Sequence, residues 1–90
     1  MPIVEETKAQ KRFKDTFGEH IPPKPVRVSD RNWRMFVDHI RHGLGYEQLA
    51  GKYLDETTGA RLTRSRTSQI VARALDWAIK EENYRQNQGI

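Results

Sequence analysis

The sequence predicts an all-α fold: a small helical domain with a helix-turn-helix and a long C-terminal helix, preceded by a poorly structured N-terminal arm. Apolar residues recur at helical spacing in three segments after residue 29. Ninety residues, 36% hydrophobic and 31% charged, suit one small helical domain better than a disordered chain. The chain has no cysteine, which excludes disulfides and thiolate metal sites.

The first 28 residues form the predicted arm, which is basic and contains prolines. Gly18 and the prolines at 22, 23 and 25 interrupt any continuous helix, because proline lacks a backbone donor and restricts its neighbour. Residues 4–16 carry a thin apolar stripe that includes Phe13, which leaves two alternatives: a mobile tail or a docked helix. We therefore divide the chain into an arm (1–28) and a helix-turn-helix domain (29–90).

The first helix of the domain starts at Ser29 or Asp30, whose side chains can accept the free amide hydrogens of a helix start. Gly43 ends it as a left-handed cap. A second helix starts at Gly45, with Leu44 and Leu49 as a hydrophobic staple. A polar, glycine-containing loop over residues 55–61 follows. The apolar positions of the two helices are Trp33, Phe36, Val37 and Ile40, then Tyr46, Leu49, Ala50 and Tyr53.

The last helix begins at Thr63 and continues to about Tyr84. Its buried stripe is Thr67, Ile70, Val71, Ala74, Trp77 and Ala78. The predicted common core is Trp33, Phe36, Ile40, Leu49, Ile70, Ala74 and Trp77. Leu75 and Ile79 lie on a second side of this helix and need a cover, either the arm or a second subunit. We favour a homodimer through Leu75 and Ile79, because prolines separate the arm from the domain.

The start of this helix carries the strongest functional signal. Residues 61–73 contain four arginines and no acidic residue, and residues 61–90 have a net charge of +3. Arg66, Gln69 and Arg73 form a row on one flank, with Arg64 in the first turn and small serines nearby. Arginine can grip guanine and glutamine can pair with adenine, so a major-groove contact with double-stranded DNA is expected. The candidate DNA-binding residues are Arg64, Ser65, Arg66, Ser68, Gln69 and Arg73.

Residues 46–50 (Tyr-Glu-Gln-Leu-Ala) and 62–75 (Leu-Thr-Arg-Ser-Arg-Thr-Ser-Gln-Ile-Val-Ala-Arg-Ala-Leu) resemble region four, the C-terminal promoter-reading domain of bacterial sigma factors. The shared residues are Thr63, Arg64, Arg66, Gln69, Ile70, Arg73, Ala74 and Leu75. The resemblance covers roughly residues 33–80 and implies a small all-helical domain that docks on RNA polymerase, with DNA contacts at Arg64 and Gln69.

Ser65 and Ser68 stand where the sigma family usually has Glu and Arg, and the turn is longer than usual, so the preferred DNA sequence does not transfer. The other sigma regions are also missing. We therefore predict a stand-alone bacterial or phage transcription regulator in the cytoplasm, associated with the nucleoid. Two alternatives remain open: a sigma-like protein that binds RNA polymerase or another protein with little DNA affinity, and an accessory of DNA packaging or recombination.

Other kinds of site find little support. His39 and His42 share a helix face but lack a third ligand, so we expect a surface pair at the helix end rather than a metal site. Ser65 and Ser68 have no histidine nearby in the sequence to make a nucleophile. We expect no catalytic residue and no cofactor. No apolar run approaches the ~20 residues of a membrane span, so no membrane partner is expected.

Overall fold

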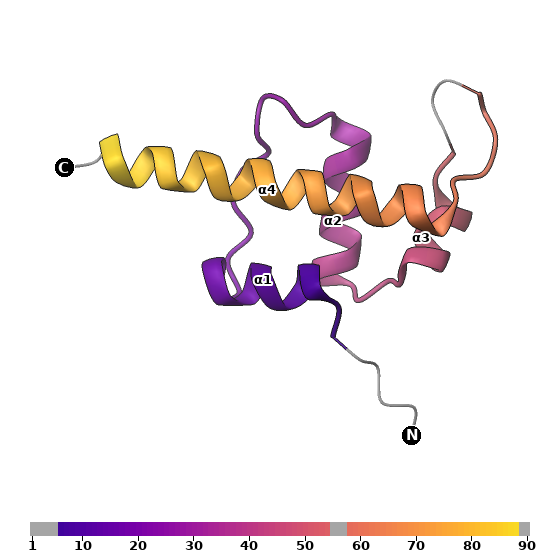
Figure 1. The fold of residues 1–90 in the computed structure, drawn as a ribbon, viewed down its shortest axis with the longest axis horizontal. Coiled ribbons are helices and arrows are strands. Elements are labelled where there is room, and N and C mark those ends of the chain that lie inside the picture. The colour runs from indigo at the N-terminus through magenta and orange to yellow at the C-terminus, as the bar shows by residue number, and fades with distance from the viewer. Residues whose placement is uncertain (1–5, 55–57, 89–90) are drawn as a thin grey trace.

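The computed structural model describes residues 6–54 and 58–88 and confirms the all-helical class. Its helices are α1 (Lys8–Phe17), α2 (Asp30–Arg41), α3 (Tyr46–Lys52) and α4 (Arg64–Gln88). The long α4 crosses α2, and its C-terminal end extends beyond the other helices (Figure 1). The described residues contain no strand, only an isolated antiparallel bridge between Leu54 and Arg61. None of the helices in this described part is both long and apolar enough to cross a membrane.

The caps expected for α2 and α3 are present. The Ser29 hydroxyl accepts from the backbone N–H of Asn32 (3.2 Å) at the start of α2. Gly43, just beyond the end of this helix, has a φ of 69°, a left-handed conformation that glycine adopts without a steric penalty. Gly45 precedes α3, and its backbone N–H donates to the side chain of Gln48 (2.9 Å). Local sequence signals therefore set these helix ends.

Thr63 caps α4. Its hydroxyl accepts from the backbone N–H of Arg66 (3.1 Å), and its carbonyl accepts from the hydroxyl of Thr67 (2.8 Å). The helix then continues to Gln88, one turn past the predicted end near Tyr84. Because α3 ends at Lys52, eleven residues join the two helices, which is longer than the turn of an ordinary helix-turn-helix.

The core confirms the predicted phase of α4. Ile70 is 4% exposed, and Phe36, Leu49 and Ala74 are buried as expected. The predicted core residues Trp33, Ile40 and Trp77 are partly buried and pack around the cluster that holds Phe36, Leu49 and Ala74. Ile70 lies instead in a second cluster with Met35, Ala50 and Leu62, so the predicted common core is divided in two. Six further residues are buried that helix periodicity did not assign to the core: Ala9, Phe13, Val28, Met35, Leu62 and Leu75.

The helix α1 packs into this core, so the described part of the predicted segment, residues 6–16, is docked rather than a mobile tail. Residues 4 and 5 lie outside the described residues. Phe13 is 2% exposed and shares a cluster with Leu75, which is 1% exposed. Ile79 packs against the same cluster. The expectation that a second subunit covers Leu75 was therefore wrong, since α1 covers it within the chain. The physical reason lies in the linker: Pro22 and Pro25 are themselves buried, so the proline segment folds back onto the domain instead of separating α1 from it. Ile79 is half-buried, and a homodimer stays a prediction.

His39 is also placed differently from the expected surface pair. His42 is exposed, but His39 is completely buried. Its Nδ1 donates to the carbonyl of Leu44 (2.7 Å), so in the neutral ring Nε2 accepts from the hydroxyl of Thr7 (2.7 Å). The ring stacks on Tyr46 at 4.6 Å between centroids. Burial lowers the pKa of His39, although the hydrogen bond to Leu44 acts in the opposite direction. The neutral ring therefore links α1 to the α2–α3 turn.

Candidate nucleic-acid interface

The open side of α4 carries the predicted row of polar residues. Arg66, Gln69 and Arg73 are all exposed, because burial of Ile70 and Ala74 fixes the rotation of the helix. Within residues 6–54 and 58–88, neither arginine forms an ion pair and the Gln69 amide has no hydrogen-bond partner. Three side chains with strong donors are thus available to an external ligand.

The other candidate residues lie differently. Ser65 is exposed, like the row. The Arg64 guanidinium lies 3.8 Å from the Glu47 carboxylate of α3, with 72% of its side chain exposed. Ser68 is half-buried, and its hydroxyl donates to the carbonyl of Ser65 (3.0 Å). Since Arg64 and Ser68 are four residues apart, they share the flank that faces α3 rather than the flank of Arg66. The six candidates therefore occupy two flanks and the open side between them.

A hollow of about 150 Å³ lies beside the Arg66 flank, and sequence reasoning missed most of its lining. Arg66 and Arg73 border it together with Arg27, Asn32 and Trp77. Arg27 belongs to the segment before α2, which the sequence marked only as part of the basic, proline-containing arm. The one sequence signal for this hollow was the position of Trp77 on the helix, at the edge of the apolar stripe and next to the arginine row. The contact with the segment before α2 is long-range, so helix periodicity could not reveal it.

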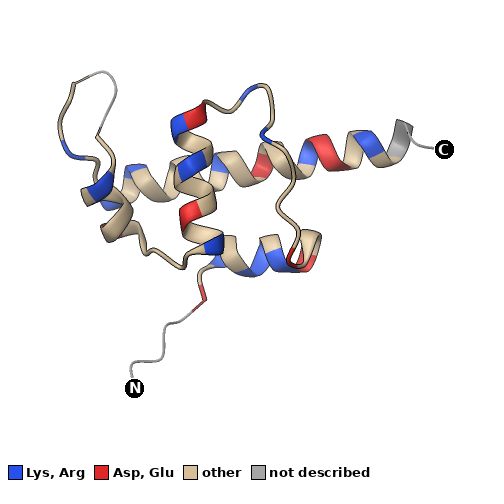
Figure 2. Cartoon of the chain, turned by 180° about the vertical axis from the view of Figure 1, so that it is seen from behind, with Lys and Arg blue, Asp and Glu red and all other residues tan. Residues whose placement is uncertain are grey.

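Charge along α4 changes between its two halves. Figure 2 shows basic residues without acidic ones on the first half of this helix, whereas acidic and basic residues alternate on the second half. The acidic Asp76 pairs with Arg12 of α1, and Glu81 pairs with Arg85. Both carboxylates form ion pairs with residues outside the arginine row, so neither neutralises the positive charge of Arg66. The first half of α4 therefore presents an excess of positive charge at the surface.

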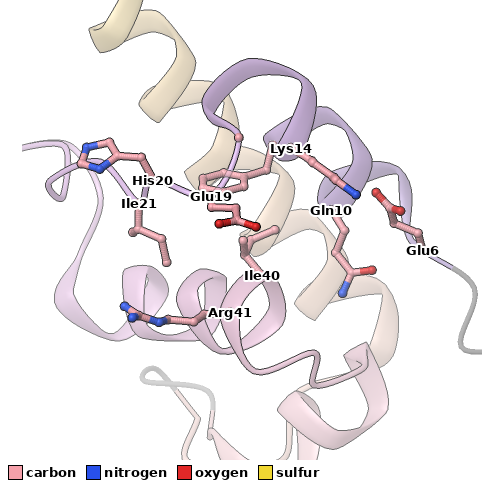
Figure 3. Close-up of a pocket in the computed structure, with 10 residues that line it drawn as sticks. Glu6, Gln10, Lys14, Glu19, His20, Ile21, Ile40 and Arg41 are labelled. Carbon is pink, nitrogen blue, oxygen red and sulfur yellow. The ribbon is translucent and has the colours of Figure 1, made fainter.

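A larger hollow of about 660 Å³ lies between α1, residues 18–21 and the end of α2. Phe13, Ile21 and Ile40 supply its apolar lining. In the close-up, Lys14 and Arg41 extend toward opposite sides (Figure 3). Small-molecule sites place a few polar groups so that they converge on one ligand. These two cations do not converge on one point. This hollow is therefore a weaker candidate for a functional site than the exposed side of α4.

Metal chemistry has no support in the described residues, which contain no group of three histidine, aspartate or glutamate side chains placed to hold an ion. Comparison of this chain with models of protein families, with curated proteins and with solved structures finds no match. The resemblance to sigma region four therefore stays a prediction from the motif. The geometry of α4 itself is the basis for assigning a function.

Proposed function

We propose that the protein is a DNA-binding transcription regulator that places the first half of α4 in the major groove. The observation that carries the proposal is the row of Arg66, Gln69 and Arg73, exposed on one side of α4 and without partners in the described chain. An α-helix with its side chains is ~10–12 Å wide and fits a major groove ~12 Å wide. Bidentate arginine and glutamine side chains are the groups that distinguish bases there.

The shape of the chain supports this docking. Its extents are 45 × 38 × 16 Å, so the molecule is thin in one direction. In Figure 1, viewed along that thin direction, α4 lies across the front of α2. A helix mounted in this way can approach a duplex without the helices behind it colliding with the DNA. The buried threonine at 67 and the cap at Thr63 hold the first turn rigid at the point of contact.

The test begins with selection of a preferred sequence from random DNA duplexes by the parent protein. Arg66→Ala and Gln69→Ala are each expected to lower affinity for the selected duplex by ~1–3 kcal/mol, about 5- to 150-fold. Arg41→Ala and Gln86→Ala are the matched controls, because both residues are exposed and Arg41 lies by the α1–α2 hollow. Fluorescence anisotropy of labelled duplexes gives the affinities.

Arg64 provides a contrasting variant. It lies in the first turn of α4, on the flank of α3 and away from the row, so we expect it to contact a phosphate rather than a base. Arg64→Ala is therefore expected to weaken binding to all duplexes alike. Failure of the parent to enrich any duplex would overturn the proposal. Parent-like affinity of both Arg66→Ala and Gln69→Ala would show that this side of α4 is not the reading surface.

A further inference from the structure

Trp77 holds two basic side chains at the outer edge of the small hollow. The Arg27 guanidinium carbon lies 4.9 Å from the centre of the Trp77 ring, and the Lys80 ammonium nitrogen lies 4.8 Å from it. Attraction between a cation and the ring face stabilises each placement. The two cations come from different elements, the turn before α2 and the second half of α4. The Trp77 ring thus brings one cation from each of these two elements close together.

The turn that carries Arg27 is pinned to α4. The backbone N–H of Val28 donates to the carbonyl of Pro25 (3.1 Å), and the Lys24 ammonium donates to the carbonyl of Val28 (2.8 Å). The backbone N–H of Val26 reaches a carboxylate oxygen of Glu81 (3.4 Å). Pro25 and Val28 are buried beneath the turn, while Arg27 stays exposed. Arg27 is therefore presented from an ordered position, which reduces the entropy lost when it binds a partner.

Lys80 extends the arginine row along α4. Arg66, Arg73 and Lys80 are seven residues apart in turn, so they follow nearly the same line with ~10.5 Å between neighbours along the axis. All three are exposed, and none forms an ion pair within the described residues. Arg27 joins the line beside Trp77, between Arg73 and Lys80. A line of cations ~21 Å long matches an extended polyanion better than a single phosphate group.

We propose that Arg27 and Lys80 form a second DNA contact, in which they bind phosphates of the duplex beside the segment that α4 reads. This inference rests on the proposed function and adds the backbone contact to it. Trp77 acts as a positioning residue that fixes both cations without touching the DNA itself. The N–H donors of a guanidinium lie in its plane. Contact of its face with a ring therefore leaves these donors free for phosphate oxygens. Such contacts raise affinity for every sequence and carry no base preference.

The experiment compares Arg27→Ala and Lys80→Ala with Lys11→Ala, which removes one exposed cation from α1. Affinities for the selected duplex and for an unrelated duplex are measured over a series of salt concentrations. Each of the first two variants is expected to lose roughly 3- to 10-fold for both duplexes at about 0.1 M salt. The slope of log affinity against log salt should fall by about 0.9 for each, while Lys11→Ala keeps the parent slope.

Trp77 is tested by a cycle of variants. Trp77→Leu should reproduce the combined loss of Arg27→Ala and Lys80→Ala, because Trp77 holds both cations. Adding either alanine substitution to the Trp77→Leu background should then have little further effect. Trp77→Phe, which keeps an aromatic face, should restore most of the affinity and of the salt slope. A purely structural role of Trp77 would change stability without this pattern, which circular dichroism and urea unfolding of each variant would reveal.

The results separate the two proposals. A parent that binds DNA and loses affinity in Arg66→Ala, but whose Arg27→Ala and Lys80→Ala variants keep both affinity and salt slope, would overturn the phosphate contact and leave the proposed function intact. Loss confined to the selected duplex would also overturn it, since that pattern belongs to a base contact. A parent that binds no duplex would overturn the proposed function and this contact with it.

Discussion

Replacing Phe13 with alanine measures how strongly α1 is bound to the rest of the fold. Phe13 is 2% exposed, and its ring centre lies 5.1 Å from that of Phe17 and 5.6 Å from that of Phe36, the latter edge to face. It also belongs to the cluster that buries Leu75. If α1 were a loosely attached arm, this substitution would leave the stability of the remaining helices almost unchanged.

The expected loss follows from this environment. Burying a phenylalanine contributes ~1.5–3 kcal/mol, and its aromatic contacts add ~0.5–1.5 kcal/mol each. With the cavity that remains, Phe13→Ala should lower the free energy of unfolding by ~3–5 kcal/mol. Since a 90-residue domain has roughly 5–13 kcal/mol in total, this is a large fraction of its stability.

Urea unfolding followed by circular dichroism measures the change. Lys11→Ala is the control, because Lys11 is exposed on the same helix, and its effect should stay within ~0.5 kcal/mol. The midpoint of Phe13→Ala should fall by more than about 1 M urea. A loss below about 1 kcal/mol, close to that of Lys11→Ala, would refute the conclusion that α1 and the other helices share one core.

Two other changes test the remaining structural arguments. Burial lowers the pKa of His39 below its ordinary value of 6.5, so the unfolded chain binds the proton more tightly, and stability should decline as the pH falls below about 6.5. His39→Gln should remove this dependence, whereas His42→Gln should keep it. Urea unfolding between about pH 7.5 and 5 measures the effect. Thr63→Ala removes the cap of α4 and should lower stability by ~1 kcal/mol in the same assay, whereas Thr16→Ala, at an exposed position of α1, should have a smaller effect.

The sequence was sufficient to predict the helices of the domain because their signals are local. Ser29, Gly43 and Gly45 act on residues within one turn, and the spacing of Ile70 and Ala74 reports one face of one helix. The position of α1 depends instead on contacts between residues far apart in the sequence, with α2 through Phe36 and His39 and with α4 through Leu75. The sequence showed a second apolar side on α4 that included Leu75, but an apolar side alone does not identify the element that covers it. Three prolines were read as a separator, and only the burial of Pro22 and Pro25 shows otherwise.

The same distinction explains the candidate interface. The exposure of Arg66, Gln69 and Arg73 follows from the helix phase, so the sequence could predict it. The neighbourhood of Arg27 and Trp77 could not be predicted, because it requires the turn before α2 to lie against α4. The sequence around a basic residue in a proline-containing segment does not indicate whether its side chain is free or lies over an aromatic ring.

Exposure of the row is not in itself an argument for DNA, because packing of the apolar side forces some residues of α4 outward. The identity of those residues carries the argument. An ordinary solvated helix mixes charges of both signs, as the second half of α4 does, where Glu81 pairs with Arg85 four residues later. The first half carries only arginine among its charged residues. Arg66 and Arg73 have no acidic partner within the described residues, and such unpaired cations repel one another and lower stability. Such an arrangement on a capped and well-packed helix is physically reasonable when a polyanion supplies the missing charge, which is why DNA is the proposed partner.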